Sequence, residues 1–156
     1  MKVGILFIGD IMKKFLFLFT LLFSFFLLGC SNPSMTALTS SNIDAPISIR
    51  YDELVDMLAR SESFVLYISS DTCSSCLEFK PILDSFIASS TVVIYQIEAS
   101  SELPLDNLLI PFTFTPTIVF VEDGVIVNQS DPISNEVVFS DYKSFSKYFY
   151  SFYSLK

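Results

Sequence analysis

The motif Cys73-Ser74-Ser75-Cys76 contains the residues of this chain best suited to chemistry. The surrounding pattern predicts that Cys73 begins a helix, where the helix dipole and unpaired backbone N–H groups favour the thiolate. Cys76 then lies one turn later, close enough to form a small disulfide with Cys73. The motif therefore indicates thiol–disulfide exchange, in which Cys73 attacks a substrate disulfide and Cys76 resolves the mixed disulfide. Ser74 and Ser75 could donate hydrogen bonds to the Cys73 thiolate.

Other uses of two closely spaced cysteines are less consistent with this chain. A tetrahedral zinc site needs four ligands, usually Cys or His, and the sequence contains no His. Haem attachment requires His after the second Cys, where Leu77 stands. We therefore expect no metal and no cofactor. A purely structural disulfide stays open as an alternative, although so short a loop would stabilise the fold only slightly.

The elements that must position this motif can be read from the apolar pattern. Residues 51–60 have one apolar helical face, and residues 64–68 form a short apolar run that predicts a buried strand. After a polar loop at 69–72, residues 73–88 predict a helix in which Pro81 should introduce a kink. The early acids of the first helix suit a helix N-terminus.

The second half of the chain predicts a strand, a hairpin and a final helix. Residues 92–97 predict a second buried strand parallel to the first, because a helix connects the two. Asp123-Gly124 between apolar runs at 117–121 and 125–127 is typical of a β-hairpin. A short helix is expected near 105–110. Aromatic residues at helical spacing from 142 to 152 predict a C-terminal helix, capped by Ser140 or Asp141.

The N-terminal segment has the composition of a secretory signal. Lys13 and Lys14 precede a largely apolar run that ends in Gly29-Cys30. This ending resembles the bacterial lipobox, in which the cysteine receives a diacylglyceryl group and becomes the mature N-terminus. The prediction is a signal peptide over 1–29, with translation starting at Met1 or at Met12, and a lipid-anchored location at the cell membrane on its extracytoplasmic face. An uncleaved transmembrane helix is the alternative, although the apolar run falls short of the roughly 20 residues that span a bilayer.

Charge and composition separate the segments that follow. Residues 30–45 comprise the lipidated Cys30 and a stretch rich in polar residues, which predicts a flexible tether, and residues 46–156 form the folded domain. The whole chain has a formal net charge of −8. Because the segment before Cys30 is net basic, the excess of acidic residues lies in the domain, which argues against nucleic-acid binding.

The motif and its surroundings resemble the thioredoxin superfamily. The strand at 64–68, the CxxC helix with Pro81, and Thr115-Pro116 before a strand and an Asp-Gly turn match that family's pattern over roughly residues 51–156. The resemblance implies an α/β thioredoxin-like fold, with a central mixed sheet and helices on both faces. It also implies that Pro116 is cis and that Thr115 offers backbone hydrogen bonds to bound substrate. The chain is also similar to the small bacteriocin-transport accessory proteins, which have the same fold.

Two departures from the family pattern keep a second function open. Thr72 stands where thioredoxins place Trp, and Tyr67 stands where they place a buried acid. Asp71 is nearer to the motif and is expected to be a solvated acid or a helix cap. The leading interpretation is a membrane-anchored thiol–disulfide oxidoreductase whose partners are protein thiols or disulfides and a membrane redox protein. The alternative is a redox-inactive accessory or binding lipoprotein with the same fold, for example in peptide export or immunity.

Overall fold

The computed structural model describes residues 35–36, 39–40, 43–100 and 109–154. The predicted signal segment, the predicted lipid-attachment residue Cys30 and most of the expected helix at 105–110 lie outside the described residues. The chain divides into two units, Met1–Pro33 and Ser34–Lys156, and everything described below belongs to the second. Within the described ranges, no helix combines the length and apolar character that crossing a bilayer requires.

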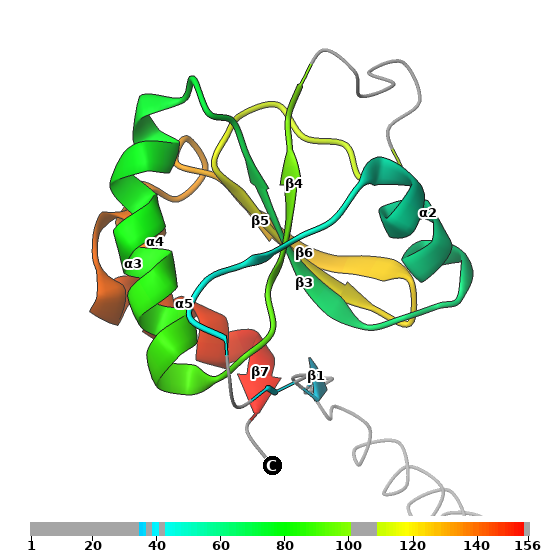
Figure 1. Cartoon of the computed structure of the whole chain (residues 1–156). Helices are drawn as coiled ribbons and strands as arrows, with labels where there is room; N and C mark the ends of the chain where they lie inside the picture. The colour runs from blue at the N-terminus through cyan, green and yellow to red at the C-terminus, as the bar shows by residue number, and fades with distance from the viewer. Residues whose placement is uncertain (1–34, 37–38, 41–42, 101–108, 155–156) are drawn as a thin grey trace, which may run out of the picture. The chain divides into compact units, whose positions relative to one another are not determined.

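A mixed β-sheet of five strands forms the centre of the domain, with the order β2-β4-β3-β5-β6. The strands are β2 (Ile47–Ser48), β3 (Phe64–Ser69), β4 (Tyr95–Glu98), β5 (Thr117–Glu122) and β6 (Val125–Ser130). As predicted, β3 and β4 are parallel, whereas β5 and β6 form an antiparallel hairpin. Figure 1 shows this sheet between helices that cover both of its faces.

Three helices cover one face of the sheet. They are α3 (Ser74–Ser90), α4 (Glu136–Ser140) and α5 (Tyr142–Phe152), and they lie on the left of Figure 1. Their core with the sheet is largely aromatic. Phe86 contacts the rings of Phe145 and Phe149, with centroids 5.0 Å and 4.7 Å away. The aromatic periodicity of the C-terminal segment is therefore core packing, and Asp141 caps α5 by accepting a hydrogen bond from the Ser144 N–H.

The other face of the sheet packs against α2 (Tyr51–Ala59). Side chains on β3 alternate between the two faces, because successive residues of a strand point in opposite directions. Leu66 and Ile68 belong to the core beneath α2, whereas Val65 and Tyr67 belong to the core beneath α3. The whole of β3 is buried, so its continuous apolar run is that of a central strand.

Several boundaries differ from the sequence prediction. The strand predicted from residue 92 begins at Tyr95, and Val92 forms an isolated bridge to Thr39. Leu109 and Ile110 form a bend, so the described end of the helix expected at 105–110 is not helical. The hairpin's second strand extends to Ser130, beyond the predicted residue 127.

Parts of the segment expected to act as a tether pair with the domain. β1 (Met35–Thr36) forms a parallel two-residue ladder with β7 (Tyr153–Ser154). The Ser40 N–H donates to the Thr91 carbonyl oxygen at 2.9 Å. Polar composition does not reveal such pairing, because backbone groups form it whatever the side chains are.

Candidate active site

The start of α3 is formed by the first cysteine of the motif. Cys73 is the N-cap residue, with extended φ and ψ of −89° and 113°, and the Cys76 N–H donates to its Sγ atom at 3.1 Å. A cap residue accepts hydrogen bonds from N–H groups that have no partner within the helix. The Cys73 sulfur therefore accepts a hydrogen bond from one of the free N–H groups at the start of α3.

The loop before β5 completes the site from a distant part of the sequence. The Cys73 Sγ–H donates to the Thr115 carbonyl oxygen at 3.2 Å, and the Thr115-Pro116 peptide bond is cis, as the sequence predicts. Antiparallel pairing explains this proximity. Because Ile68 of β3 lies opposite Thr117 of β5, the end of one strand and the start of the other meet at the same edge.

The two cysteine thiols have different environments. Cys73 is partly exposed, whereas Cys76 is only 4% exposed, and both are free thiols. Burial opposes ionisation of Cys73, but hydrogen bonds from Cys76, Thr115 and the Ser75 backbone outweigh it and lower the pKa of Cys73. Burial, together with the hydrogen bond to Cys73, raises the pKa of Cys76 to about 11. Of the two thiols, that of Cys73 is thus the one that ionises more readily.

The residues next to the two cysteines contribute to different degrees. Of the two serines expected to donate to Cys73, Ser75 does so through its backbone N–H and lowers the pKa of Cys73. Of the two roles expected of Asp71, a solvated acid or a helix cap, the structure shows the first, because Cys73 is the cap of α3. The Asp71 side chain is exposed, as expected of a solvated acid, and its N–H donates to the Glu98 carboxylate at 2.8 Å.

Tyr67 lies beneath the motif, at the position where the family pattern predicts an acid. It is 2% exposed, and its ring packs edge-on against Phe79 with centroids 5.9 Å apart. Burial is the main cause that raises the pKa of Tyr67 far above its ordinary value, and the neighbouring Cys76, Cys73 and Asp84 add to it. The effect of Asp84 on the pKa of Tyr67 cannot be predicted from the sequence, because it depends on how α3 packs over β3.

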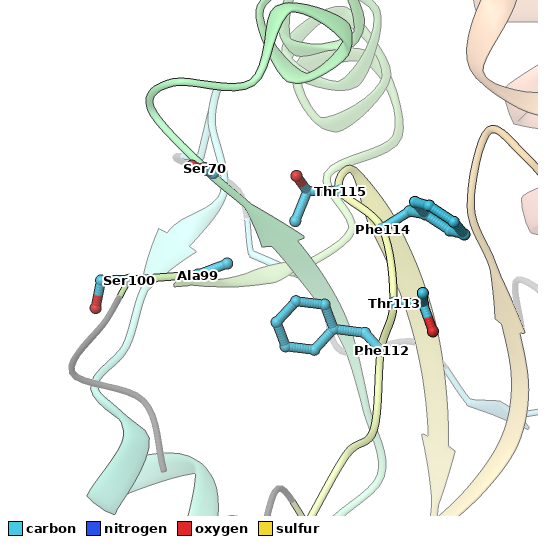
Figure 2. A pocket seen from close by; sticks show the side chains of 7 residues that line it. All are labelled: Ser70, Ala99, Ser100, Phe112, Thr113, Phe114 and Thr115. Atoms are coloured by element: carbon cyan, nitrogen blue, oxygen red, sulfur yellow. The ribbon is translucent and has the colours of Figure 1, made fainter. Parts of the chain in front are cut away.

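A pocket of about 370 Å³ opens beside Thr115. Figure 2 shows the Phe112 ring directed into it and the Phe114 ring directed away from it. Its remaining lining residues are Ser70, Ala99, Ser100 and Thr113. The sequence analysis did not identify this pocket, because its walls come from three loops without a shared motif. Within the described residues, no group of three His, Cys, Asp or Glu side chains could hold a metal ion.

Comparison with known proteins defines the fold. No family model and no curated protein matches the sequence. A mutant thioredoxin from Halobacterium salinarum NRC-1 has a TM-score of 0.55 at 18% identity, covering 75% of this chain and 98% of that one. Thioredoxin from Aeropyrum pernix has a TM-score of 0.53 at 19% identity, with coverages of 76% and 96%.

A third match comes from a complex of thioredoxin f2 with ferredoxin: thioredoxin reductase. It has a TM-score of 0.54 at 13% identity, covering 70% of this chain and 96% of the matched one. Because each matched chain is covered almost completely, the likeness extends over the whole domain rather than over one motif. The protein therefore has the thioredoxin fold, with its cysteine motif at the start of α3.

Proposed function

We propose that the protein is a thiol–disulfide oxidoreductase held at the extracytoplasmic face of the membrane by a lipid on Cys30. The observation that carries the catalytic part is the contrast between two adjacent thiols. Cys73 is partly exposed with a lowered pKa, and Cys76 is buried with a raised one. A structural disulfide needs no such difference, whereas a nucleophile and a resolving thiol do.

The geometry supports a two-step exchange. The Cys73 thiolate attacks one sulfur of a substrate disulfide, and the other sulfur leaves as a thiolate that takes up a proton. The Cys76 thiol then loses its proton and attacks Cys73 Sγ, which releases the second substrate sulfur as a thiol. The substrate gains two electrons and two protons, and the protein keeps the Cys73–Cys76 disulfide. The same steps in reverse oxidise a dithiol.

Thr115 is the residue proposed to hold the substrate during this exchange. Its carbonyl oxygen already accepts a hydrogen bond from Cys73, so a polypeptide passing the thiol would lie against the same backbone. The adjoining pocket could accept a side chain next to the substrate cysteine. Protein thiols and disulfides are therefore the proposed substrates, with Thr115 and Pro116 in the binding role.

A membrane protein that restores the starting redox state is the proposed partner. A matched structure contains a thioredoxin in complex with a reductase, and any exchange protein needs an equivalent source or sink of electrons. Export suits this chemistry, because disulfides persist outside the cytoplasm. The apolar run that ends at Gly29-Cys30 supports the anchor.

Trapping of substrates tests the proposal directly. In cells that make Cys76→Ser, Cys73 should accumulate in mixed disulfides with other proteins, which non-reducing electrophoresis reveals. A Cys73→Ser, Cys76→Ser double variant is the matched control and should trap none. If neither thiol of the reduced, folded protein reacts at neutral pH, the accessory or binding role becomes the better explanation of the fold.

A further inference from the structure

The segment that follows the predicted lipid anchor is bound to one end of the domain. We name residues 35–36, 39–40 and 43–49 the N-terminal arm. The arm begins with β1, which pairs with β7. Thr39 then forms a bridge with Val92, and the Ser40 N–H donates to the Thr91 carbonyl oxygen at 2.9 Å. The arm is therefore bound to the residues that follow α5 and to those that follow α3.

The parts of the domain that hold the arm are themselves fixed. Ile43 packs against the core beneath α3, and the Ile47 N–H donates to the Ile94 carbonyl oxygen at 2.9 Å. Tyr153 of β7 is 4% exposed, and its ring stacks on Phe149 with centroids 4.7 Å apart. The arm thus continues the packing of the domain instead of acting as a free tether.

The cysteine motif lies at the opposite end of the domain. Cys73 caps the start of α3, whereas the arm is bound at Thr91, where α3 ends. Figure 1 shows the start of α3 at the top of the domain and β1 with β7 at the bottom. The 17 residues of α3 span about 25 Å. The Cys73 thiol is therefore about one helix length away from the end that holds the arm.

Pairing of the arm shortens the tether between the lipid and the domain. Only residues 31–34 separate Cys30 from β1. An extended chain covers at most about 3.6 Å per residue, so the steps from Cys30 to Met35 reach about 18 Å. A tether that stayed free from residue 30 to residue 46 would reach about 58 Å. The shorter reach is less than the length of α3, so it cannot lift the arm far enough for Cys73 to turn onto the bilayer.

We propose that the N-terminal arm holds the domain with the Cys73 site facing away from the membrane, so that it exchanges with thiols and disulfides above the bilayer and not with those at its surface. The inference rests on the proposed anchor at Cys30 and on the proposed exchange activity. It restricts the substrates to exported polypeptides and to domains that project from the membrane. The membrane protein that restores the redox state must carry its reactive cysteines on such a domain.

Two disulfides at different heights test this orientation. The reduced, lipidated full chain is placed in phosphatidylglycerol vesicles and mixed with soluble 2,2′-dipyridyl disulfide, or placed in vesicles whose phosphatidylethanolamine carries a pyridyl disulfide on its headgroup. In both reactions the Cys73 thiolate forms a new S–S bond, the old S–S bond breaks, and pyridine-2-thiolate leaves and takes up a proton. Cys76 then displaces the remaining thiol. The absorbance of pyridine-2-thione gives the rate.

A longer tether should change one of these rates and not the other. Insertion of about twelve Gly and Ser residues after Pro33 extends the reach from Cys30 to β1 to about 60 Å. The rate with the headgroup disulfide should rise roughly tenfold or more, because the thiol gains a high effective concentration at the surface. The rate with the soluble disulfide should stay the same. Equal headgroup rates for the unaltered and the lengthened chains would overturn the proposal.

Variants of the arm separate its pairing from the length of the chain. Thr36→Pro with Ser40→Pro removes the N–H that binds Thr91 and places a residue without a donor in β1. This double variant should also react faster with the headgroup disulfide. Thr36→Ala with Ser40→Ala keeps both N–H groups and is the matched control, which should react as the unaltered chain does. Equal headgroup rates in the two double variants would show that the pairing does not limit the reach.

Fluorescence measures the orientation without the chemistry. One chain carries a dye on Cys73 with Cys76→Ser, and another carries it on the exposed position Ala88→Cys near the end of α3, with both motif cysteines replaced by Ser. Energy transfer to a rhodamine lipid should be at least about twofold more efficient from residue 88, because about 22 Å separates the two positions along the helix. Equal transfer from both positions would contradict the orientation.

The two readouts keep the proposals apart. If no chain reacts with either disulfide while energy transfer differs as expected, the exchange activity fails and the orientation is supported. If the chain does not remain in the vesicles, the anchor at Cys30 fails, and this inference fails with it.

Discussion

The thiol of Cys73 donates to the carbonyl oxygen of Thr115, 42 residues away in sequence, across 3.2 Å. This contact joins the N-cap of α3 to the loop that precedes β5. Neither element alone creates the site. The chemistry therefore depends on the antiparallel pairing of β3 with β5, which brings the two loops to one edge of the sheet.

The difference between the two thiols predicts an order of modification. After reduction, iodoacetamide should alkylate Cys73 before Cys76, because only the thiolate reacts and the pKa of Cys73 is lowered. The rate should stay high below the ordinary pKa of cysteine, about 8.5, and should fall as the pH drops through the lowered value. Peptide mapping by mass spectrometry checks the order, and faster labelling of Cys76 would reverse the assigned roles.

The hydroxyl group of Thr115, which is distinct from the carbonyl oxygen that accepts from the thiol, also lowers the pKa of Cys73 and predicts a smaller effect. Thr115→Val removes the hydroxyl group but retains the backbone carbonyl, and should raise the pKa of Cys73 because one stabilising hydrogen bond is lost. Thiolate absorbance followed against pH measures the shift. Thr113→Val, which removes a nearby exposed hydroxyl group, should leave that pKa where it is.

The tip of the hairpin predicts a loss of stability. Gly124 has a φ of +76°, and a Cβ atom there would lie 2.9 Å from the Leu58 carbonyl oxygen at the end of α2. Gly124→Ala should therefore lower the free energy of unfolding by about 1–3 kcal/mol. Asp123→Asn is the control at the adjacent position, where φ is 50°, because Asn tolerates this region. Equal unfolding midpoints for the two variants would contradict the prediction.

The aromatic core predicts a larger loss. Phe86 is fully buried, and its ring contacts four other aromatic rings of α5, so Phe86→Ala should cost about 3–5 kcal/mol. Phe114→Ala removes a ring that is 45% exposed and should cost far less. Urea unfolding of both variants, followed by circular dichroism, measures the two losses in the free energy of unfolding and so the contribution of the contacts between Phe86 and α5.

The anchor proposed at Cys30 has its own test. Cys30→Ser should abolish incorporation of a labelled fatty acid and release the protein from the membrane fraction, or leave it unprocessed. The reason is that the thiol is the only group in the lipobox-like ending that can carry the diacylglyceryl chain. Labelling of the variant as strong as that of the unaltered protein would rule out this attachment site.

Sequence predicted the parts of the fold that local pattern determines. Three elements were each predicted by a local pattern of a few residues: the buried run of β3, the Asp-Gly turn and the aromatic spacing of α5. β2 could not be foreseen, because its two exposed residues have no apolar pattern. The site shows the same division. Cys73, Cys76 and Pro116 belong to a recognisable motif, whereas the relation of Tyr67 to Asp84 arises only when α3 packs on the sheet.

The use of Cys73 Sγ as the cap of α3 links oxidation to folding through a thermodynamic cycle. A thiolate accepts the Cys76 N–H more strongly than a disulfide sulfur does, so the cap favours the reduced, folded protein. Because the cap stabilises the reduced state, it raises the reduction potential of the cysteine pair, so the oxidised state takes up electrons more readily. A better-capped helix would therefore make the same cysteine pair a stronger oxidant.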